Sequence, residues 1–587
     1  MQAGWRNPGG PKYLVAVVAR LVDLAVRRPW ALLAGNLVFL AAAMALAITS
    51  ASGLPIGSLA PSGSETGQPD LIVATTGRAR VNSAVYRVAL QVISSQVQSD
   101  AAVSETRRGP ISKDSRSTSL LVSFRDLDQS EQQDAVERIE RGIDPGPLEV
   151  SYGGEVATLL DARHDLASDF WRLELIALPF VALILAVALG PRLAAGPIIC
   201  AATAIAGALA GLVILGLFMD ISLLGIAPAA VVGLVLGVEA PCAMYSRFRA
   251  EATRAPRAEA IRRAVVTAAE VAVPAGVAAS LVTVGLLATS LDQAASMILG
   301  CALAAALVLL SGLACAPAVL ALAPDDRHAS GGAPVTAWLG RQPARLTGFL
   351  AGSSRRTWLS IAVATVLMLA AAEPLVHGRT TPFGAADLPA GSPSRTATGA
   401  AGVDIHDGGG GSLFDDLPLA AGVSAVALAV VVGIGFRSGR IPIPLAIASL
   451  LPAAAACGLC VLVFQDGHLA PAIAQEEQGT LETGAAAAML AGMVSVSAAR
   501  SVSALQATRE TGAGRLEPGW GATWSASLVL PGAIVATLIG AAATGVLAGA
   551  SLYAAREFGL AVAVGLLIDL VLLRAPLIAA LTRWARG

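Results

Sequence analysis

The sequence predicts an α-helical polytopic membrane protein, with twelve transmembrane helices in two pseudo-symmetric six-helix halves and one α+β domain outside the membrane. Three observations support this fold class. Of the 587 residues, 55% are hydrophobic and only 14% are charged, which is unlike a soluble globular composition. Apolar runs close to twenty residues long, enough to cross a bilayer, recur along the chain. One long segment after the first run has strand and helix patterns instead.

The chain is expected to open with a helix that lies on the cytoplasmic membrane surface. Residues 1–29 include the amphipathic stretch "VVARLVDLAVRRPW", which is typical of such an interfacial helix. The first transmembrane helix is predicted at residues 30–51. No small-residue cleavage pattern follows this run, so it is interpreted as a span and not as a secretory signal.

Residues 52–170 are predicted to form the domain outside the membrane. The stretches "DLIVATTG", "STSLLVSFR" and "LEVSYGG" have strand composition, and "VNSAVYRVALQVISSQVQS" and "SEQQDAVERIERGID" have helical spacing. One further short strand would complete a ferredoxin-like order of elements.

Five closely spaced spans are predicted within residues 171–323, near 172–190, 194–218, 222–245, 265–289 and 295–322. Residues 324–356 then form a cytoplasmic linker with a second amphipathic helix, in "VTAWLGRQPARLTGFLAGSSRRTW". The second half therefore begins as the first does, with a surface helix followed by an opening span, here at 357–373.

The second half continues with a much shorter segment outside the membrane. Residues 374–416 are rich in Gly, Ala and Ser without apolar periodicity, so we expect a short flexible extracytoplasmic loop. The last five spans are predicted within residues 417–587, near 417–436, 441–464, 481–503, 526–547 and 557–581.

Arginine distribution predicts the orientation in the cell membrane. One set of span ends is rich in arginine, while opposite short loops such as "MDIS" and "SLDQ" contain no Lys or Arg. Because positive residues favour the cytoplasmic side, both termini of this multi-pass protein are expected to be cytoplasmic. The arginine-rich ends contain Arg27, Arg28, Arg192, Arg247 to Arg263, Arg355, Arg356, Arg437, Arg440, Arg509, Arg515, Arg583 and Arg586.

The sequence favours no enzymatic function, no cofactor and no nucleic-acid partner. The five histidines are scattered, and no metalloprotease, nucleophile-elbow or phosphate-binding motif occurs. Cys457 and Cys460 have the spacing of a metal or redox pair, but they lie in the apolar run "AAAACGLCVLVF", so all six cysteines are predicted to be small buried residues.

Four charged residues interrupt the apolar runs and are candidate functional residues. Glu239 follows eighteen uncharged residues, and a carboxylate at that depth costs roughly 3 kcal/mol. Arg500 follows the uncharged run "TGAAAAMLAGMVSVSAA". Asp569 and Arg574 lie in the last span. Because they are five positions apart, they should not share one face of an α-helix, and we expect each to tie to neighbouring spans. A part in proton transfer is the alternative.

Four stretches, in order, resemble the RND superfamily of proton-driven exporters, most of all its MMPL branch of actinobacterial lipid and hydrophobic-compound transporters. They are "SYGGEVATLLDARHDLASDF", "SRFRAEATRAPRAEAIRRAVVTAAEVAVPAGVAASLVTVGLLA", "VLVFQDGHLAP" and "FGLAVAVGLLIDLVLLRAPLIAAL". The resemblance implies a porter-type outer domain and export of a lipid or other hydrophobic cargo.

The resemblance also implies a position for the proton relay. In the family this is usually a Gly-x-Asp-Tyr stretch in span 4 and its counterpart in span 10, each Asp facing the Tyr of the other span. Glu239 and Ala240 stand at the first pair of positions, and Ala499 and Arg500 at the second. Glu239 would therefore face Arg500. The Gly-x-x-x-Gly face of Gly233 and Gly237 would let spans 4 and 10 approach closely. The alternative is that Arg500 extends to the cytoplasmic surface.

These substitutions leave two functional hypotheses. Arginine keeps its proton, and a permanent cation favours the ionised form of a neighbouring carboxylate, so proton coupling would be altered or lost. The first hypothesis is an exporter of a lipid or hydrophobic small molecule. The second is a non-transporting relative that scaffolds or regulates a lipid-export or envelope complex. The family pattern has a second outer domain that is missing here, and a second copy of the chain or an envelope partner could supply it.

Overall fold

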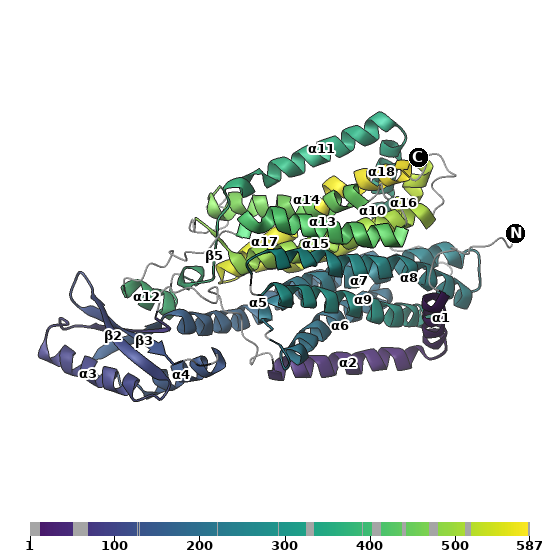
Figure 1. Ribbon diagram of the computed structural model, residues 1–587. Helices are drawn as coiled ribbons and strands as arrows, with labels where there is room; N and C mark the ends of the chain where they lie inside the picture. Colours follow the sequence, from purple (N-terminus) through teal and green to yellow (C-terminus); the bar gives the residue numbers. More distant parts are fainter. Residues whose placement is uncertain are drawn as a thin grey trace.

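The computed structural model describes residues 12–50, 69–125, 127, 129–219, 221–291, 293–323, 334–389, 391–401, 413–436, 442–468, 479–510 and 518–584. Long helices form a bundle, and a separate α/β domain lies at one end of it (Figure 1). We call this the domain end. The opposite end, where the surface helix α1 (Lys12–Arg27) and the last helix α18 (Ala575–Trp584) lie, is the termini end.

The α/β domain contains a four-stranded antiparallel sheet in the order β2-β3-β1-β4. Along the chain the elements are β1 (Leu71–Gly77), α3 (Ala84–Gln98), β2 (Val103–Ile111), β3 (Ser117–Phe124), α4 (Gln129–Gly142) and β4 (Leu148–Gly153). The three strands and two helices expected from the sequence are present, and β2 is the additional strand. Helix α3 begins at the N-cap Ser83 and buries Tyr86, Leu90, Ile93 and Val97 against the sheet.

A short helix from the second half of the chain covers the other face of this sheet. Helix α12 (Pro393–Ala400) begins at Ser392, whose side chain accepts a hydrogen bond from the backbone N–H of Arg395. It packs on β4, where the N–H of Gly154 donates to Oγ1 of Thr398 at 3.3 Å. The expectation that residues 374–416 form a loop without regular structure is therefore wrong for residues 393–400. Residues 402–412 lie outside the described residues.

Helix α5 (Glu155–Leu189) runs without a break from the α/β domain into the bundle (Figure 1). The boundary expected between residues 170 and 171 therefore lies inside one helix. Only the second part of α5, Leu175–Leu189, is apolar, and it is shorter than a usual membrane-spanning segment.

Eleven helices in the described part of the chain are long and apolar enough to cross a membrane. The sequence predicted twelve spans, and the apolar part of α5 lies where the second of them was expected. Some of these membrane-crossing segments extend beyond one helix into the short helical turns that follow it. In chain order, the helices that form them or form their first part are α2 (Pro29–Ser50), α6 (Pro191–Leu215), α7 (Ile226–Ala252), α8 (Arg257–Leu281), α9 (Ala294–Leu322), α11 (Ser354–Ala372), α13 (Leu413–Phe436), α14 (Pro442–Cys460), α15 (Thr483–Glu510), α16 (Pro518–Gly545) and α17 (Tyr553–Ile568).

The two amphipathic surface helices occupy matching places in the two halves. Helix α1 packs on α8 and α9, and α10 (Pro334–Ala351) packs on α16 and α18. Val18, Val22 and Ala25 of α1 are buried, as the spacing of an amphipathic helix requires. Each surface helix therefore covers the last two spans of its own half.

Helix α15 lies at the centre of the bundle, and its residues 484–502 are all buried. It packs beside α7, where Gly492 leaves room for Pro228 and Val231. Gly233 and Gly237 were expected to let α7 approach α15 closely, and this expectation is wrong. Side chains at these two positions would collide with α6, at residues 201, 204 and 205, and not with α15. The close approach of α7 and α15 depends on Gly492 instead.

Candidate functional site: a buried network of two acids and two arginines

The four charged residues singled out in the sequence meet in the middle of the bundle. Glu239 lies on α7 and Arg500 on α15, while Asp569 and Arg574 begin and end η8 (Asp569–Arg574), the segment between α17 and α18. Their exposed fractions are 8%, 1%, 0% and 1% respectively. We call these four residues the charge network.

Arg500 joins the acids of two other segments. Its Nε donates to Oε2 of Glu239 at 2.8 Å, and its Nη1 donates to Oδ2 of Asp569 at 3.0 Å. Its third nitrogen, Nη2, donates to the backbone carbonyl of Ala533 on α16 at 3.3 Å. The guanidinium thus lies against Glu239, as the pairing hypothesis expected, and does not extend to the surface of the bundle.

Asp569 is the centre of the network. Besides Arg500, it accepts hydrogen bonds from Oγ of Ser497 at 2.8 Å and from Nε of Arg574 at 3.0 Å. Nη2 of Arg574 donates to its other oxygen as well. Arg574 also donates to Oγ of Ser501 at 3.2 Å. One buried carboxylate therefore accepts hydrogen bonds from two guanidinium groups.

The contact between Asp569 and Arg574 corrects the expectation that residues five apart would not face each other. Residues Asp569–Arg574 form a π-helical segment. In a π-helix the backbone bonds join residues five apart, so that side chains at this spacing lie above one another. An α-helix, the geometry expected from the sequence, would place the two side chains on different faces.

The network is neutral and its arginines are satisfied. Every guanidinium nitrogen of Arg500 and Arg574 has an acceptor within 3.4 Å. Buried ion pairs are tolerated when the charges balance and the remaining donors are bonded. This balance explains how two acids and two arginines persist among apolar helices.

A cavity of about 70 Å³ lies beside Glu239, between α7, α8, α9, α15 and α16. Ala240, at the expected tyrosine position of span 4, and Ala499, at the expected aspartate position of span 10, are among its lining residues. The side chain of Glu239 keeps 10% of its surface exposed, against 1% and 0% for Arg500 and Asp569. A cavity of this size has room for water, so Glu239 is the member of the network that solvent reaches most easily.

An ion pair that the sequence argument missed joins the same two helices nearer the termini end. Nη2 of Arg247 on α7 lies 3.1 Å from Oε2 of Glu510 on α15, with the two side chains 6% and 17% exposed. Arg247 also lines the cavity beside Glu239. Helices α7 and α15 are therefore tied by opposite charges at two levels.

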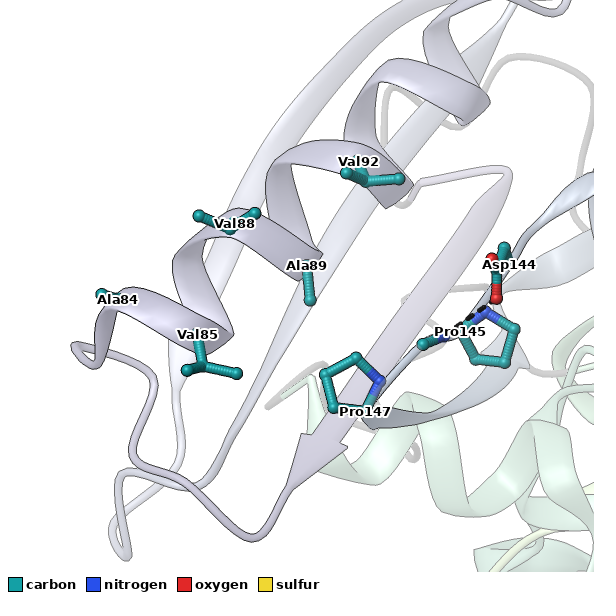
Figure 2. Close-up of a pocket in the computed structure, with 9 residues that line it drawn as sticks. Ala84, Val85, Val88, Ala89, Val92, Asp144, Pro145 and Pro147 are labelled. Atoms are coloured by element: carbon teal, nitrogen blue, oxygen red, sulfur yellow. Dashed lines mark hydrogen bonds between the residues drawn. The ribbon is translucent and has the colours of Figure 1, made fainter.

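The α/β domain has an open apolar groove of about 560 Å³ on its surface. Figure 2 shows Val85, Val88 and Val92 along α3, facing the turn that contains Pro145 and Pro147. The three valines are 62%, 63% and 45% exposed. A stripe of exposed valines on one helix face is an apolar surface of the kind that contacts a partner or ligand.

The network and the groove belong to a chain that matches a known family. The profile of the MMPL family matches residues 71–371, about half of the chain, including the α/β domain, Glu239 and the cavity-lining parts of α8 and α9. The chain belongs to the MMPL family. As its apolar helices also indicate, it is a multi-pass membrane protein.

Two further similarities accompany the MMPL match. A protein of Streptomyces coelicolor, SCO6666, whose name describes it only as a membrane protein, is 30% identical over 277 residues. That alignment covers 46% of this chain and 38% of the relative, so the chain matches well under half of the relative's length. A crystal structure of SecDF in its super-membrane-facing form covers 98% of both chains, with 13% identity and a TM-score of 0.49.

Proposed function

We propose that this MMPL-family protein exports a lipid or other hydrophobic molecule across the cell membrane, with Glu239 as the one acid of the charge network that titrates. The observation that supports this most is the position of Glu239. It is bonded to one arginine of the network and, alone among the four, borders the cavity. Asp569, with two arginines and a serine around it, would stay ionised and hold Arg500 in place.

The proposed architecture is that of an RND-type transporter with twelve spans, the second of them formed by the apolar part of α5. The strand-helix-strand-strand-helix-strand order and the antiparallel sheet β2-β3-β1-β4 support a ferredoxin-like, porter-type domain. Among the described residues, the arginine-rich ends of α1 and α18 lie at the termini end, which supports cytoplasmic termini and a domain end that faces outward.

The proposed coupling step is the protonation of Glu239. An ionised Glu239 attracts Arg500 and holds α7 against α15. A proton that arrives through the cavity would neutralise the carboxylate, so that Arg500 keeps only Asp569 as an ionic partner. The contact between α7 and α15 would then loosen, and deprotonation would restore it. Helix movement and proton transfer would be linked by this one pair.

The cargo surface that we propose is the apolar groove along α3. Its valines suit a hydrocarbon chain, because burial of apolar surface stabilises a complex in proportion to the area removed from water. The opposing wall that the family resemblance assigns to a second outer domain is not present among the described residues between 374 and 416, which form only short elements, the longest complete one being the eight-residue helix α12. A second copy or an envelope-complex partner would complete the pocket.

The second candidate function is a non-transporting scaffold or regulator of a lipid-export or envelope complex. The closed, neutral network favours it, because groups that are fully paired have no need to titrate. The described part of the chain has one α/β domain, and without an opposing wall this domain does not form a closed cargo pocket. This also favours the scaffold. The two candidates differ in whether cargo moves in response to a pH gradient.

Cargo movement in membrane vesicles distinguishes them. A phospholipid with a fluorescent acyl chain serves as the probe, an imposed pH gradient as the driving force, and Glu239→Gln as the variant. We expect gradient-driven transport by the natural protein and a loss of at least about a hundredfold in the variant, the lower end of a general acid–base effect. Glu270→Gln, which removes a carboxyl group outside the network, is the control. Equal transport by both proteins removes Glu239 from the mechanism, and no transport by either favours the scaffold.

A further inference from the structure

A second group of buried acids lies at the domain end of the bundle, where three segments meet. Asp387 belongs to η5 (Ala385–Asp387), Glu482 to β6 (Leu481–Glu482) and Glu557 to α17. Their exposed fractions are only 6%, 4% and 3%. Strand β5 (Thr380–Thr381) pairs in parallel with β6, and this pairing brings the segment before Asp387 against the start of α15.

Glu482 is held in a setting that favours a negative charge. Its two carboxylate oxygens accept hydrogen bonds from the backbone N–H groups of Gly484 and Ala485, at the first turn of α15. The N-terminal end of a helix has a partial positive charge and unpaired donors, so both features stabilise an anion there.

Glu557 has one oxygen in a polar contact and one without. Its Oε2 accepts a hydrogen bond from the backbone N–H of Glu482 at 2.9 Å. Its Oε1 is buried and has no hydrogen-bond partner in the described part of the chain. An ionised carboxylate with a bare oxygen is costly in such a place, while a protonated carboxyl group is neutral. Glu557 therefore points to a ligand that removes its charge.

Groups on two neighbouring helices bear on this charge balance. Helix α12 brings Arg395, whose Nη1 donates to the carbonyl of Leu388 at 2.8 Å. Helix α14 brings the thiols of Cys457 and Cys460, and Sγ of Cys460 lies 3.9 Å from the carbonyl oxygen of Glu557. One arginine near three acids does not neutralise them. No group of acids, histidines and cysteines in the described residues has the arrangement of a metal site.

We propose that Asp387, Glu482 and Glu557 form a proton-binding site at the domain end, which we call the outer carboxyl site. The ligand is a proton taken up from the solution on that side of the membrane. Its uptake stabilises the contact of residues 380–388 with α15 and α17, because one charge is removed from a buried group of like charges. Leu388, packed against Leu552 at the start of α17, makes the apolar part of the same contact.

The two acids outside the spans support this assignment. Burial, and next the negative charge of Glu482, raise the pKa of Asp387 to about 8. Burial raises the pKa of Glu482 to about 7, against the lowering effect of its two backbone hydrogen bonds. Both folded-state pKa values lie above the ordinary values of 3.8 and 4.5. The folded protein therefore binds more protons than the unfolded chain between about pH 4 and pH 8, and its stability from this site falls as the pH rises through that range.

Infrared spectroscopy of the purified protein in lipid tests the proposal, because the carbonyl stretch of a protonated carboxyl group is distinct from that of a carboxylate. We expect a protonated-carboxyl signal at pH 6 that decreases by pH 9. Each of Asp387→Asn, Glu482→Gln and Glu557→Gln should remove part of that change. Glu149→Gln, which alters an exposed acid of β4, should leave it intact. A change that all three variants leave as large as in the natural protein overturns the proposal.

The pH dependence of the unfolding temperature provides a second test, which is used if one of the single variants folds poorly. The unfolding temperature of the natural protein should decrease between pH 6 and pH 9, and this decrease should be smaller in the Asp387→Asn/Glu482→Gln double variant. An equal decrease in both proteins overturns the proposal. Neither measurement requires transport, so each tests the outer carboxyl site independently of the proposed exporter function.

Discussion

Arg500 lies between two acids that belong to different segments, and its removal would leave both with fewer bonds. We predict that Arg500→Ala lowers the free energy of unfolding by about 3–5 kcal/mol, the usual effect of leaving a buried charge unpaired. Glu239→Gln/Arg500→Gln should cost less, because it removes the acid and the cation together and Asp569 keeps Arg574. Thermal or denaturant unfolding in detergent measures the difference. A double variant less stable than Arg500→Ala would refute the pairing.

The pairing of Glu239 with Arg500 could be predicted from single residues, because each is a charge in an apolar run that needs a partner. The convergence of Arg500 and Arg574 on Asp569 could not. It depends on the π-helical segment of residues 569–574, and the sequence contains no proline or glycine there that would mark a departure from α-helical geometry. Ser497 and Ser501, which complete the network, are indistinguishable in sequence from other small residues of α15.

Close packing between helices α6 and α7 depends on Gly237. A side chain there would lie 2.7 Å from Cα of Ala201, a backbone atom that cannot move away alone. We predict that Gly237→Ala lowers the unfolding temperature, with a cost of about 1–3 kcal/mol from overpacking. Gly433→Ala is the matched control, because nothing lies within 4 Å of the side chain it would add on α13. Equal unfolding temperatures for the two variants would contradict the packing described here.

The contact between α12 and the sheet also depends on a glycine, Gly153. A side chain at Gly153 would lie 2.7 Å from Oγ1 and 2.9 Å from the backbone nitrogen of Thr398. Gly153→Ala should therefore push α12 from β4 and make residues 393–400 easier for a protease to cut. Gly142→Ala, with no neighbour within 4 Å, should leave the cleavage rate unchanged. Unchanged cleavage in the Gly153 variant would mean that α12 does not depend on this contact.

Long elements were predictable because an apolar run of sufficient length has few other structures available to it in a membrane. Short elements were not. Helix α12 has eight residues, and its buried side chains include Ser394, Ala397 and Thr398, so no apolar stripe distinguishes it from a loop. A signal was nevertheless present in Ser392 followed by Pro393, since serine at the N-cap and proline at the first position favour the start of a helix.

At the scale of the whole molecule, two groups of buried acids lie along the same pair of segments. The charge network is deep in the bundle, while the outer carboxyl site lies where α15 and α17 begin. Glu557 and Asp569 are twelve positions apart, or about 18 Å along a helix axis. The alternation of spans and surface helices was visible in the sequence. The outer carboxyl site was not, because its acids come from three segments that only tertiary packing brings together.

We propose above that Glu239, paired with Arg500 beside a cavity, is the acid that exchanges protons in an exporter of the MMPL family. Proton movement into liposomes that contain the protein and a pH-sensitive dye tests it most directly, with an imposed gradient and lipid cargo present. We expect proton flux for the natural protein and for Glu270→Gln, and flux reduced to that of empty liposomes for Glu239→Gln. Flux through Glu239→Gln equal to that of the natural protein would contradict it.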